Sequence, residues 1–407
     1  MIGRGPAQLL AGGGWALASV AVALATGLLR TILIARLLTP AEIGLMGVAL
    51  LVLGFIEAVA STGVDTALVA TRDDVEAYID PAFAIQFTRG IAVMALLWAA
   101  APAIAAVFHS AGAASVIRWV STIAALRGLA NPAVALAIRQ LDFRRVFLWS
   151  LPEVIVSVCL TIALAFAWRS VWALVAGAIA GQAAATLASY GLVPRMPRAS
   201  LVRERIGDLL RFGRFVSWSR ALMYFSVYVD AAVVGMMAGT HTLGLYQFAS
   251  RIAELPVVTF TRAVAQVALP ALSGAQTRAA DLQRTWRTML GWVSAVNGAA
   301  AAAIVLFAGA AVPIVAGPQW LESIPLMRIL AVAMLFRAIV VLTGQLLDAI
   351  GRPAETLRLN AARLGTMLVV VVPLAAWDGV RGVAAGVLLA NAGAAMLALR
   401  VSARAVD

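Results

Sequence analysis

Long apolar stretches alternate with short polar breaks along the whole chain. Most of these stretches reach or exceed the about 20 residues that a helix needs to cross the hydrocarbon core of a bilayer. Proline, glycine and charged residues lie between them, where they end or bend helices. The pattern therefore predicts an all-α membrane protein of about 12 transmembrane helices, six in each half of the chain. The predicted spans lie near 9–36, 41–62, 81–107, 113–137, 146–167 and 170–192, and near 212–238, 243–272, 286–311, 324–349, 357–377 and 380–401.

One helical hairpin, from Leu209 to Pro256, shows the organisation most clearly. Two apolar runs flank a polar break between Gly239 and Thr242. The same hairpin occurs earlier in the chain at a constant offset of 200 residues, since Ile43, Gly44, Leu45 and Ala49 match Leu243, Gly244, Leu245 and Ala249. We therefore expect an internal duplication, with two parallel repeats related by a pseudo-two-fold axis along the membrane normal.

A polar and basic segment joins the two halves. We expect a six-helix bundle at residues 1–192, a cytoplasmic connector at 193–211 and a second six-helix bundle at 212–407. The connector ends in LVRERIGDLLRFGRF, in which apolar residues recur at roughly helical spacing among arginine and aspartate. This segment is either an amphipathic helix on the inner leaflet or a solvated lead-in to the seventh helix.

Composition excludes a soluble globular protein, because 63% of the residues are hydrophobic, 12% are charged and the mean hydropathy is +0.95. Soluble chains are about half apolar and about a quarter charged. The net charge of +12 raises the question of nucleic-acid binding. Such binding needs a clustered basic face in water. Here the arginines lie mostly singly between apolar runs, so we expect no nucleic-acid partner.

The distribution of arginine sets the predicted orientation. With the amino end inside, the connectors that face the cytoplasm are rich in arginine, above all between Arg195 and Arg214. The opposite connectors offer little beyond Arg36, Arg169 and Arg381. Cytoplasmic loops of membrane proteins carry an excess of basic residues. Both chain ends are therefore expected in the cytoplasm.

Few residues suit a metal or redox site. Cys159 is the single cysteine and lies within an apolar run, so no disulfide forms within the chain. His109 and His241 are the two histidines, both at predicted helix ends. No glycine motif that cradles phosphates follows a predicted strand. We expect no metal, no cofactor and no use of ATP.

Several motifs resemble one known family, the polysaccharide-transporter flippases of the multidrug/oligosaccharidyl-lipid/polysaccharide exporter superfamily. The longest is LLRTILIARLLTPAEIGLMGVALLVLGFIEAVASTGVDTALV at 28–69. The others are VWALVAG at 171–177, YVDAAVVGMMAGTHTLGLYQFA at 228–249, VALPALSGAQ at 267–276 and GPQWLESIPLMRIL at 317–330. The resemblance extends over nearly the whole chain, and the order and spacing of the motifs carry it.

The resemblance implies two six-helix bundles that form a V around a central cavity. It also implies that the protein carries undecaprenyl-diphosphate-linked oligosaccharide from the inner to the outer leaflet of a bacterial inner membrane, for surface polysaccharide biosynthesis. Glycosyltransferases and a polysaccharide polymerase are the expected partners in that process, besides membrane lipids. The duplication leads to a compatible expectation, because repeated bundles place a substrate site at the midplane and rock against each other in alternating access.

Two other functions stay open at this point. A membrane enzyme that polymerises lipid-linked glycans is expected to use a sizeable extracytoplasmic loop with acid and base groups. The longest candidate, 308–324, holds only Glu322 among ionisable residues, so we expect no enzyme. A multidrug antiporter of the same fold is the other alternative, and the sign of the intramembrane charge bears on it.

Charges inside the predicted spans favour an anionic substrate. Nine arginines lie five or more residues inside these spans, against four carboxylates. A charge at the bilayer centre costs about 2.5–3.5 kcal/mol on insertion scales, so the excess should face a wet cavity or a counter-ion. Guanidinium groups suit diphosphate oxygens. The arginines are Arg30, Arg89, Arg118, Arg127, Arg220, Arg251, Arg262, Arg337 and Arg363, and the carboxylates are Glu57, Glu153, Asp230 and Glu254.

Five of these arginines form the predicted substrate site: Arg30, Arg89, Arg220, Arg251 and Arg337. Arg30 matches the first-helix position at which lipid II flippases, by resemblance, keep an arginine that faces the cavity. The alternative is that the arginines only fix helix packing, snorkel to an interface or pair locally, as Arg251 and Glu254 could at i,i+3 spacing.

Two carboxylates are candidates for ion coupling. Asp230 lies in the middle of the predicted seventh helix and Glu57 in the second, and either could exchange a proton or a cation during transport. A structural salt bridge is the alternative role, in which Asp230 neutralises Arg220 or Arg30.

Overall fold

The protein is a multi-pass helical membrane protein. The computed structural model describes residues 28–29, 31–70, 75–140, 142–192, 196–198, 202–261, 264 and 279–406. Within this part of the chain, eight helices are long and apolar enough to cross a membrane, and two of them contain a break that divides them into two arms. The predicted first span lies mostly outside the described residues.

The described chain forms two compact units. One unit, here called the N-terminal unit, runs from Leu37 to Gly244. The other, here called the C-terminal unit, contains the described residues up to Arg36 together with those from Leu245 onwards. The grouping predicted from sequence, 1–192, 193–211 and 212–407, stays a prediction.

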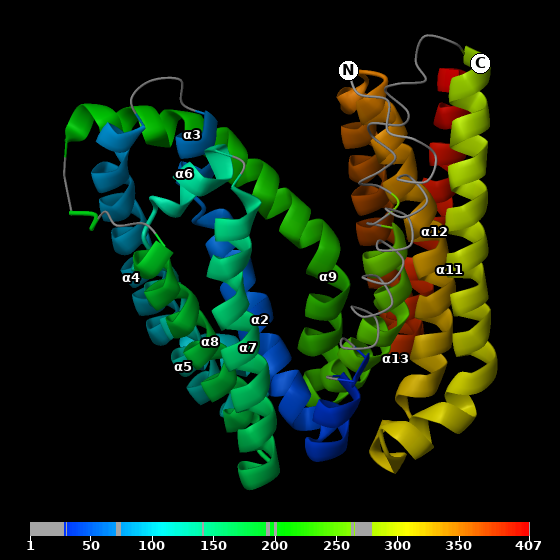
Figure 1. The fold of residues 1–407 in the computed structure, drawn as a ribbon. Coiled ribbons are helices and arrows are strands. Elements are labelled where there is room, and N and C mark those ends of the chain that lie inside the picture. Colours follow the sequence, from blue (N-terminus) through cyan, green and yellow to red (C-terminus); the bar gives the residue numbers. More distant parts are fainter. Residues whose placement is uncertain are drawn as a thin grey trace. The chain divides into compact units, whose positions relative to one another are not determined.

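The N-terminal unit is a bundle of long helices with two short helices at one end (Figure 1). Its first described helix begins with a capping box, in which Thr39 Oγ1 accepts from the Glu42 amide at 3.4 Å and the Thr39 amide donates to Glu42 Oε2 at 2.8 Å. Pro40 at the first helical position completes this start signal. The helices are α2 (Pro40–Val59), α3 (Val64–Ala70), α4 (Glu76–Val107), α5 (Ala111–Gly128), α6 (Val134–Arg139), α7 (Phe143–Trp168), α8 (Val171–Leu192) and the first arm of α9 (Arg203–Pro256).

The break in α9 falls where the sequence predicts the hairpin turn. Gly239 adopts φ 73° and ψ −175°, a conformation that favours glycine, and it separates arms at 203–238 and 240–256. A second predicted break is found in α13 (Pro353–Val406), at Asp378 and Gly379. The arms of α13 are closely packed, since a Cβ on Gly382 would lie 1.8 Å from the Leu374 carbonyl oxygen.

The C-terminal unit contains α9 from Leu245 onwards and three further long helices. A π-helical turn, Val257–Thr261, follows α9, and a 3-10 turn, Pro318–Trp320, lies between the next two helices. The long helices α11, α12 and α13 run side by side (Figure 1). Their bounds are α11 (Ala279–Val315), α12 (Ser323–Ala349) and α13 as given above.

The predicted span 113–137 is shorter in the structure, because α5 ends at Gly128 and α6 begins only at Val134. Pro132 disfavours helical geometry at the residue before it. Asn131 then fixes the loop through two hydrogen bonds. Its backbone N–H donates to Ser189 Oγ at 2.9 Å, and its side-chain Oδ1 accepts from the backbone N–H of Ala133 at 3.0 Å. The asparagine–proline pair therefore ends the helix before the apolar pattern ends.

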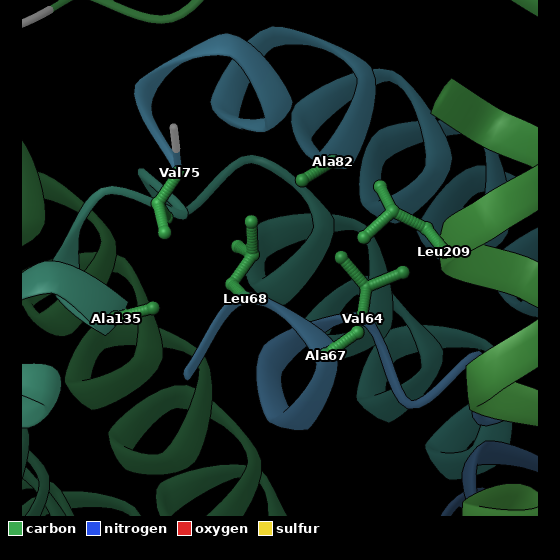
Figure 2. Packing of buried hydrophobic residues seen from close by; sticks show 7 residues of the cluster. All are labelled: Val64, Ala67, Leu68, Val75, Ala82, Ala135 and Leu209. Atoms are coloured by element: carbon green, nitrogen blue, oxygen red, sulfur yellow. The ribbon is translucent and has the colours of Figure 1, made fainter. Parts of the chain in front are cut away.

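The end of the connector packs against protein. The helix α9 begins at Arg203, and Leu209 is 2% exposed within a cluster formed by Val64, Ala67, Leu68, Val75, Ala82, Ala135 and Leu209. Figure 2 shows Leu209 pointing from α9 toward Val64 of α3. Leu209 is thus packed against α3, α4 and α6, and the two alternatives considered from sequence stay predictions for the segment as a whole.

The two repeats meet at a pair of glycines. A Cβ on Gly44 would lie 1.7 Å from the Thr240 carbonyl oxygen, and a Cβ on Gly244 would lie 1.8 Å from the Pro40 carbonyl oxygen. Both the glycines and the two carbonyl residues are related by the predicted offset of 200 residues. The contact between α2 and α9 is therefore reciprocal, and the duplication itself stays a prediction.

The end of the first helix packs against the turn between α11 and α12. Ala35 accepts hydrogen bonds through its carbonyl from Trp320 Nε1 at 2.8 Å and from Gln319 Nε2 at 3.0 Å. In return, Arg36 Nε donates to the Val315 carbonyl at 2.6 Å and Arg36 Nη2 donates to that of Ile314. Side-chain donors on each side thus bond to backbone carbonyls on the other. These hydrogen bonds hold residues 35 and 36 within the C-terminal unit.

Candidate functional site

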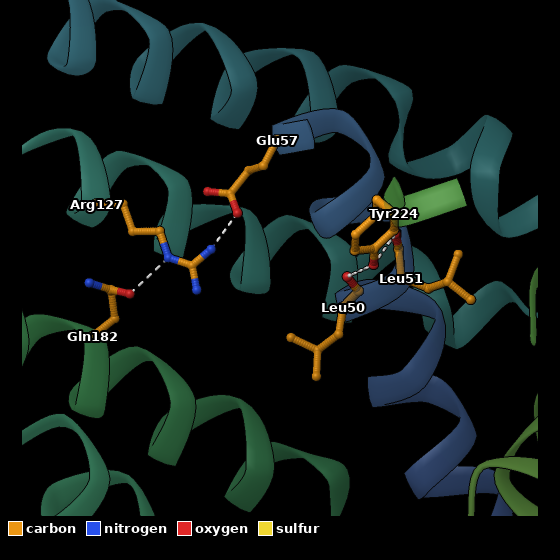
Figure 3. Close-up of polar contacts among 6 residues, drawn as sticks. All are labelled: Leu50, Leu51, Glu57, Arg127, Gln182 and Tyr224. Atoms are coloured by element: carbon orange, nitrogen blue, oxygen red, sulfur yellow. Dashed lines mark hydrogen bonds and ion pairs between the residues drawn. The ribbon is translucent and has the colours of Figure 1, made fainter. Parts of the chain in front are cut away.

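An ion pair between Glu57 and Arg127 is the centre of a polar cluster in the N-terminal unit (Figure 3). Arg127 lies in the last turn of α5, where the helix dipole favours a cation. Glu57 lies close to the end of α2, where the dipole disfavours a carboxylate. Arg127 Nη1 donates to Glu57 Oε2, and Arg127 Nε donates to Gln182 Oε1 of α8 at 2.9 Å. Three helices are therefore joined through one guanidinium.

The two partners of this ion pair differ in exposure. The side chain of Arg127 is 45% exposed, whereas that of Glu57 is 14% exposed. The second carboxylate oxygen, Glu57 Oε1, is buried and accepts no hydrogen bond from the described residues. A buried acceptor without a donor costs free energy, so Glu57 is incompletely satisfied in its present arrangement.

Arg220 of α9 lies in the same unit with neutral partners. Its Nη1 donates to Ser61 Oγ at 3.2 Å and its Nη2 donates to Thr66 Oγ1 at 3.1 Å. Ser61 follows the end of α2, and Thr66 belongs to α3. The described partners of this arginine are therefore hydroxyl groups, which position the guanidinium without neutralising it.

Tyr224 fastens α9 to α2 next to these charges. Its hydroxyl donates toward the Leu51 carbonyl at 3.1 Å, with the Leu50 carbonyl at 3.4 Å (Figure 3). The ring fits over Gly54, where a Cβ would lie 2.3 Å from the Tyr224 hydroxyl. Its other face meets Tyr228 at a centroid distance of 4.5 Å.

The C-terminal unit contains a second ion pair. Arg337 Nη1 of α12 donates to Glu254 Oε1 of α9 at 2.8 Å. The two side chains are 23% and 30% exposed, respectively. Glu254 therefore pairs with an arginine from another helix, in place of the local pair with Arg251 considered from sequence.

The two ion pairs join the same pair of predicted spans in each half of the chain. Glu57 and Glu254 lie in the second predicted span of each half, and Arg127 and Arg337 lie in the fourth. Each half thus contains an acidic second helix tied to a basic fourth helix. Sequence reasoning selected Glu57 and Arg337 as separate candidates and left their partners out of the site.

The other residues of the predicted site are less closely associated. Arg30 lies outside the described residues. Arg89 is half-buried on α4, and Arg251 is exposed on α9. Asp230 is half-buried on α9, and the described partners of Arg220 do not include it. The structure brings Arg220 into the unit that contains Glu57, and it places Arg251 and Arg337 in the other.

Three residues of the N-terminal cluster, Arg127, Gln182 and Tyr224, are absent from the site predicted from sequence. Arg127 was counted among the intramembrane arginines, and its position in the last turn of an apolar helix is the only signal that sequence offers. Gln182 lies among small residues of α8, and a polar side chain in such a helix face is a signal of cross-helix bonding. Within the described ranges, no group of three or more histidine, cysteine, aspartate or glutamate residues has the arrangement of a metal site.

The C-terminal unit also buries an arginine in its interior. Arg363 in the first arm of α13 is 8% exposed, and its Nη1 donates to Asn391 Oδ1 in the second arm at 3.3 Å. A buried charge is held by such polar contacts, because its transfer out of water is costly.

Comparison with known proteins indicates a function in polysaccharide biosynthesis. A family model described as "Polysaccharide biosynthesis protein" matches residues 33–325. The lipopolysaccharide biosynthesis protein WzxC of Escherichia coli (strain K12) is 20% identical over 384 residues, which cover 94% of this chain and 78% of that protein.

Two solved structures share the fold. The lipid II flippase MurJ in an inward closed conformation superposes with a TM-score of 0.79 at 14% identity, covering 95% of this chain and 87% of that one. An inward-facing multidrug resistance transporter of the MATE family, in the MOP superfamily, superposes with a TM-score of 0.72 at 18% identity, covering 93% of each chain. At these identities the two structures support the fold alone.

Proposed function

Because the chain belongs to the polysaccharide biosynthesis protein family, we propose that it flips a lipid-linked oligosaccharide across the bacterial inner membrane. The cargo is an oligosaccharide on undecaprenyl diphosphate, which moves from the cytoplasmic to the outer leaflet by alternating access. The observation that carries this proposal is the family match over residues 33–325, within a membrane-spanning fold shared with a lipid II flippase.

The setting follows from the same proposal. Both chain ends face the cytoplasm, and the two predicted six-helix bundles surround a central cavity. Cytoplasmic glycosyltransferases build the lipid-linked glycan, and a polymerase on the outer face consumes it. The protein itself performs no covalent chemistry in this scheme.

The substrate diphosphate is bound by arginines. Arg30, Arg89, Arg220, Arg251 and Arg337 are the proposed ligands. Arg220 supports this assignment, because its described partners are neutral hydroxyls and its positive charge stays available to an anion. Charge-assisted hydrogen bonds contribute about 1.5–3 kcal/mol each, so two or three arginines suffice for one diphosphate while the lipid tail stays in the bilayer.

Asp230 and Glu57 are the proposed carboxylates for ion coupling. We expect transport by the wild type to depend on pH or on sodium. This dependence should be lost in Asp230→Asn or in Glu57→Gln. Unchanged dependence in both variants excludes the coupling role.

The deciding experiment measures surface glycan in cells whose own gene is deleted. The cells express wild type, Arg30→Ala, Arg220→Ala or Arg251→Ala at matched membrane abundance. We expect loss of glycan in the three variants and partial recovery with Lys at the same position. Arg139→Ala, which removes an exposed arginine of α6, is the matched control and should retain glycan.

Normal glycan in all three variants would exclude the proposed site. A deletion strain with normal surface glycan and increased sensitivity to cationic drugs would instead support the multidrug antiporter, the alternative function of this fold.

A further inference from the structure

The two matched ion pairs, Glu57–Arg127 and Glu254–Arg337, suggest a role beyond helix packing. A partly exposed ion pair contributes little net stability, because solvent screening and the loss of hydration offset much of the attraction. Here an ion pair between the second and the fourth predicted span occurs in both halves of the chain. Its position in each repeat points to a function that each half performs.

The guanidinium of Arg127 is open to a ligand. Two of its nitrogens are engaged, Nη1 by Glu57 and Nε by Gln182. Nη2 makes no hydrogen bond to the described residues, and the side chain is 45% exposed. The glutamine therefore orients a planar group whose remaining edge can receive an anion.

The carboxylate partner is a weak competitor for this guanidinium. Glu57 is held through one oxygen, while Oε1 is buried without a donor among the described residues. Each phosphate of a glycan-linked diphosphate offers two terminal acceptor oxygens and can bind a guanidinium through two parallel bonds. A phosphate that reaches Arg127 thus makes more hydrogen bonds than the glutamate does.

We propose that Glu57 and Glu254 are internal substitutes for the substrate diphosphate. In the empty carrier each carboxylate occupies an arginine, Arg127 or Arg337, and the diphosphate binds by displacing it. This inference rests on the proposed function, and it adds Arg127 to the substrate-binding residues.

Substitution of one anion by another has an electrostatic reason. A bare arginine inside a membrane protein is costly, and a permanently bound anion would prevent release. A carboxylate that returns when the diphosphate leaves keeps the arginine neutralised and oriented in both states. The side chains of the second pair are 23% and 30% exposed, so the protein does not cover them completely either.

Binding of undecaprenyl diphosphate to the purified full-length protein in lipid nanodiscs tests this exchange. Glu57→Gln removes the competing charge and should tighten binding by about tenfold. Arg127→Gln should weaken binding by about tenfold or more, and Arg127→Lys should weaken it less. The double variant should resemble Arg127→Gln, because the glutamate acts only through the arginine.

The matched control is Arg118→Gln, nine residues earlier on α5, whose Nε contacts the Trp98 carbonyl at 3.4 Å. Its affinity should equal that of the wild type. Glu254→Gln and Arg337→Gln should repeat the two opposite effects in the other half. Thermal unfolding of each variant reports whether it is folded. If Arg127→Gln is not folded, Arg127→Lys is used in its place for the binding comparison.

The outcomes separate this inference from the proposed function. If the wild type binds undecaprenyl diphosphate and Glu57→Gln leaves the affinity unchanged or lowers it, the proposed exchange of anions is wrong. The ion pair is then a structural contact. Failure of the wild type to bind undecaprenyl diphosphate overturns the proposed function together with this inference. Tighter binding by Glu57→Gln with slower flipping in liposomes supports both, because release then lacks the returning carboxylate.

Discussion

Gly44 and Gly244 lie backbone against backbone, although 200 residues separate them in the sequence. A Cβ built on either glycine would lie 3.0 Å from the amide nitrogen of the other, and less than 2 Å from a carbonyl oxygen of the partner segment. The absence of a side chain is thus required at both positions, because backbone atoms cannot move aside as a flexible side chain does.

Replacement of Gly44 by alanine should separate α2 from α9. We expect a clear fall in the midpoint of thermal unfolding in detergent and loss of transport, with a similar effect of Gly244→Ala. Gly393→Ala on α13 is the control, since a Cβ there has nothing within 4 Å. That change should be neutral or raise stability by up to about 1 kcal/mol, as alanine favours helix. Equal stability of Gly44→Ala and Gly393→Ala would contradict the close contact.

Truncation of Leu209 should loosen the cluster that anchors the start of α9. Leu209 is 2% exposed among α3, α4 and α6, so Leu209→Ala should cost about 2–5 kcal/mol of unfolding free energy. Val202→Ala, at a 42% exposed side chain just before the helix, should have little effect. Thermal unfolding of the two variants gives the comparison, and similar shifts would show that Leu209 is not packed as described.

The buried contact between Arg363 and Asn391 should appear as coupling in a double-mutant cycle. Asn391→Ala removes an acceptor from a guanidinium that is 8% exposed, which should lower stability markedly. Once Arg363 is replaced by Met, the same change should cost little. The expected coupling is about 0.5–3 kcal/mol, and additive effects in unfolding measurements would exclude a direct interaction.

The indole hydrogen bond from Trp320 to Ala35 should contribute to fastening the first helix. Trp320→Phe removes the Nε1 donor and retains a ring against Phe248, which lies at a centroid distance of 4.4 Å. We expect a loss of about 0.5–1.5 kcal/mol, because Gln319 still donates to the same carbonyl. Hydrogen exchange at residues 31–36 should rise in the variant, whereas Trp292→Phe, at a 64% exposed position, should leave it unchanged.

Much of the fold follows from local sequence signals. The turn at Gly239 and the break at Asp378–Gly379 were predicted because glycine and polar residues interrupt apolar runs of membrane-spanning length. The early end of α5 differs from the prediction, because the apolar pattern resumes after Asn131 and Pro132 and outweighs this local stop signal in the sequence. The hydrogen bond from Asn131 to Ser189 of α8, which adds to the local one with Ala133, cannot be predicted from spacing.

The candidate site follows from sequence to a smaller extent. Composition identifies the charges that are costly in a membrane, and it selected Glu57, Arg220 and Arg337. It does not identify their partners, since 70 residues separate Glu57 from Arg127 and 83 separate Glu254 from Arg337. Helical spacing suggested a pair between Arg251 and Glu254 on one helix. The ion pair that Glu254 forms in the structure is with Arg337 on another helix. Pairing across helices is a property of the packed bundle.

The contact of Arg36 with the end of α11 has a consequence for synthesis of the chain. Arg36 and Ile314 are 278 residues apart, and ribosomes add about 5–20 residues per second. About 14–56 s therefore pass between translation of Arg36 and translation of its acceptor carbonyl. During this interval residues 35 and 36 have no Ile314, Gln319 or Trp320 to bind. The two residues thus complete these contacts only once the chain has been made as far as residues 314–320.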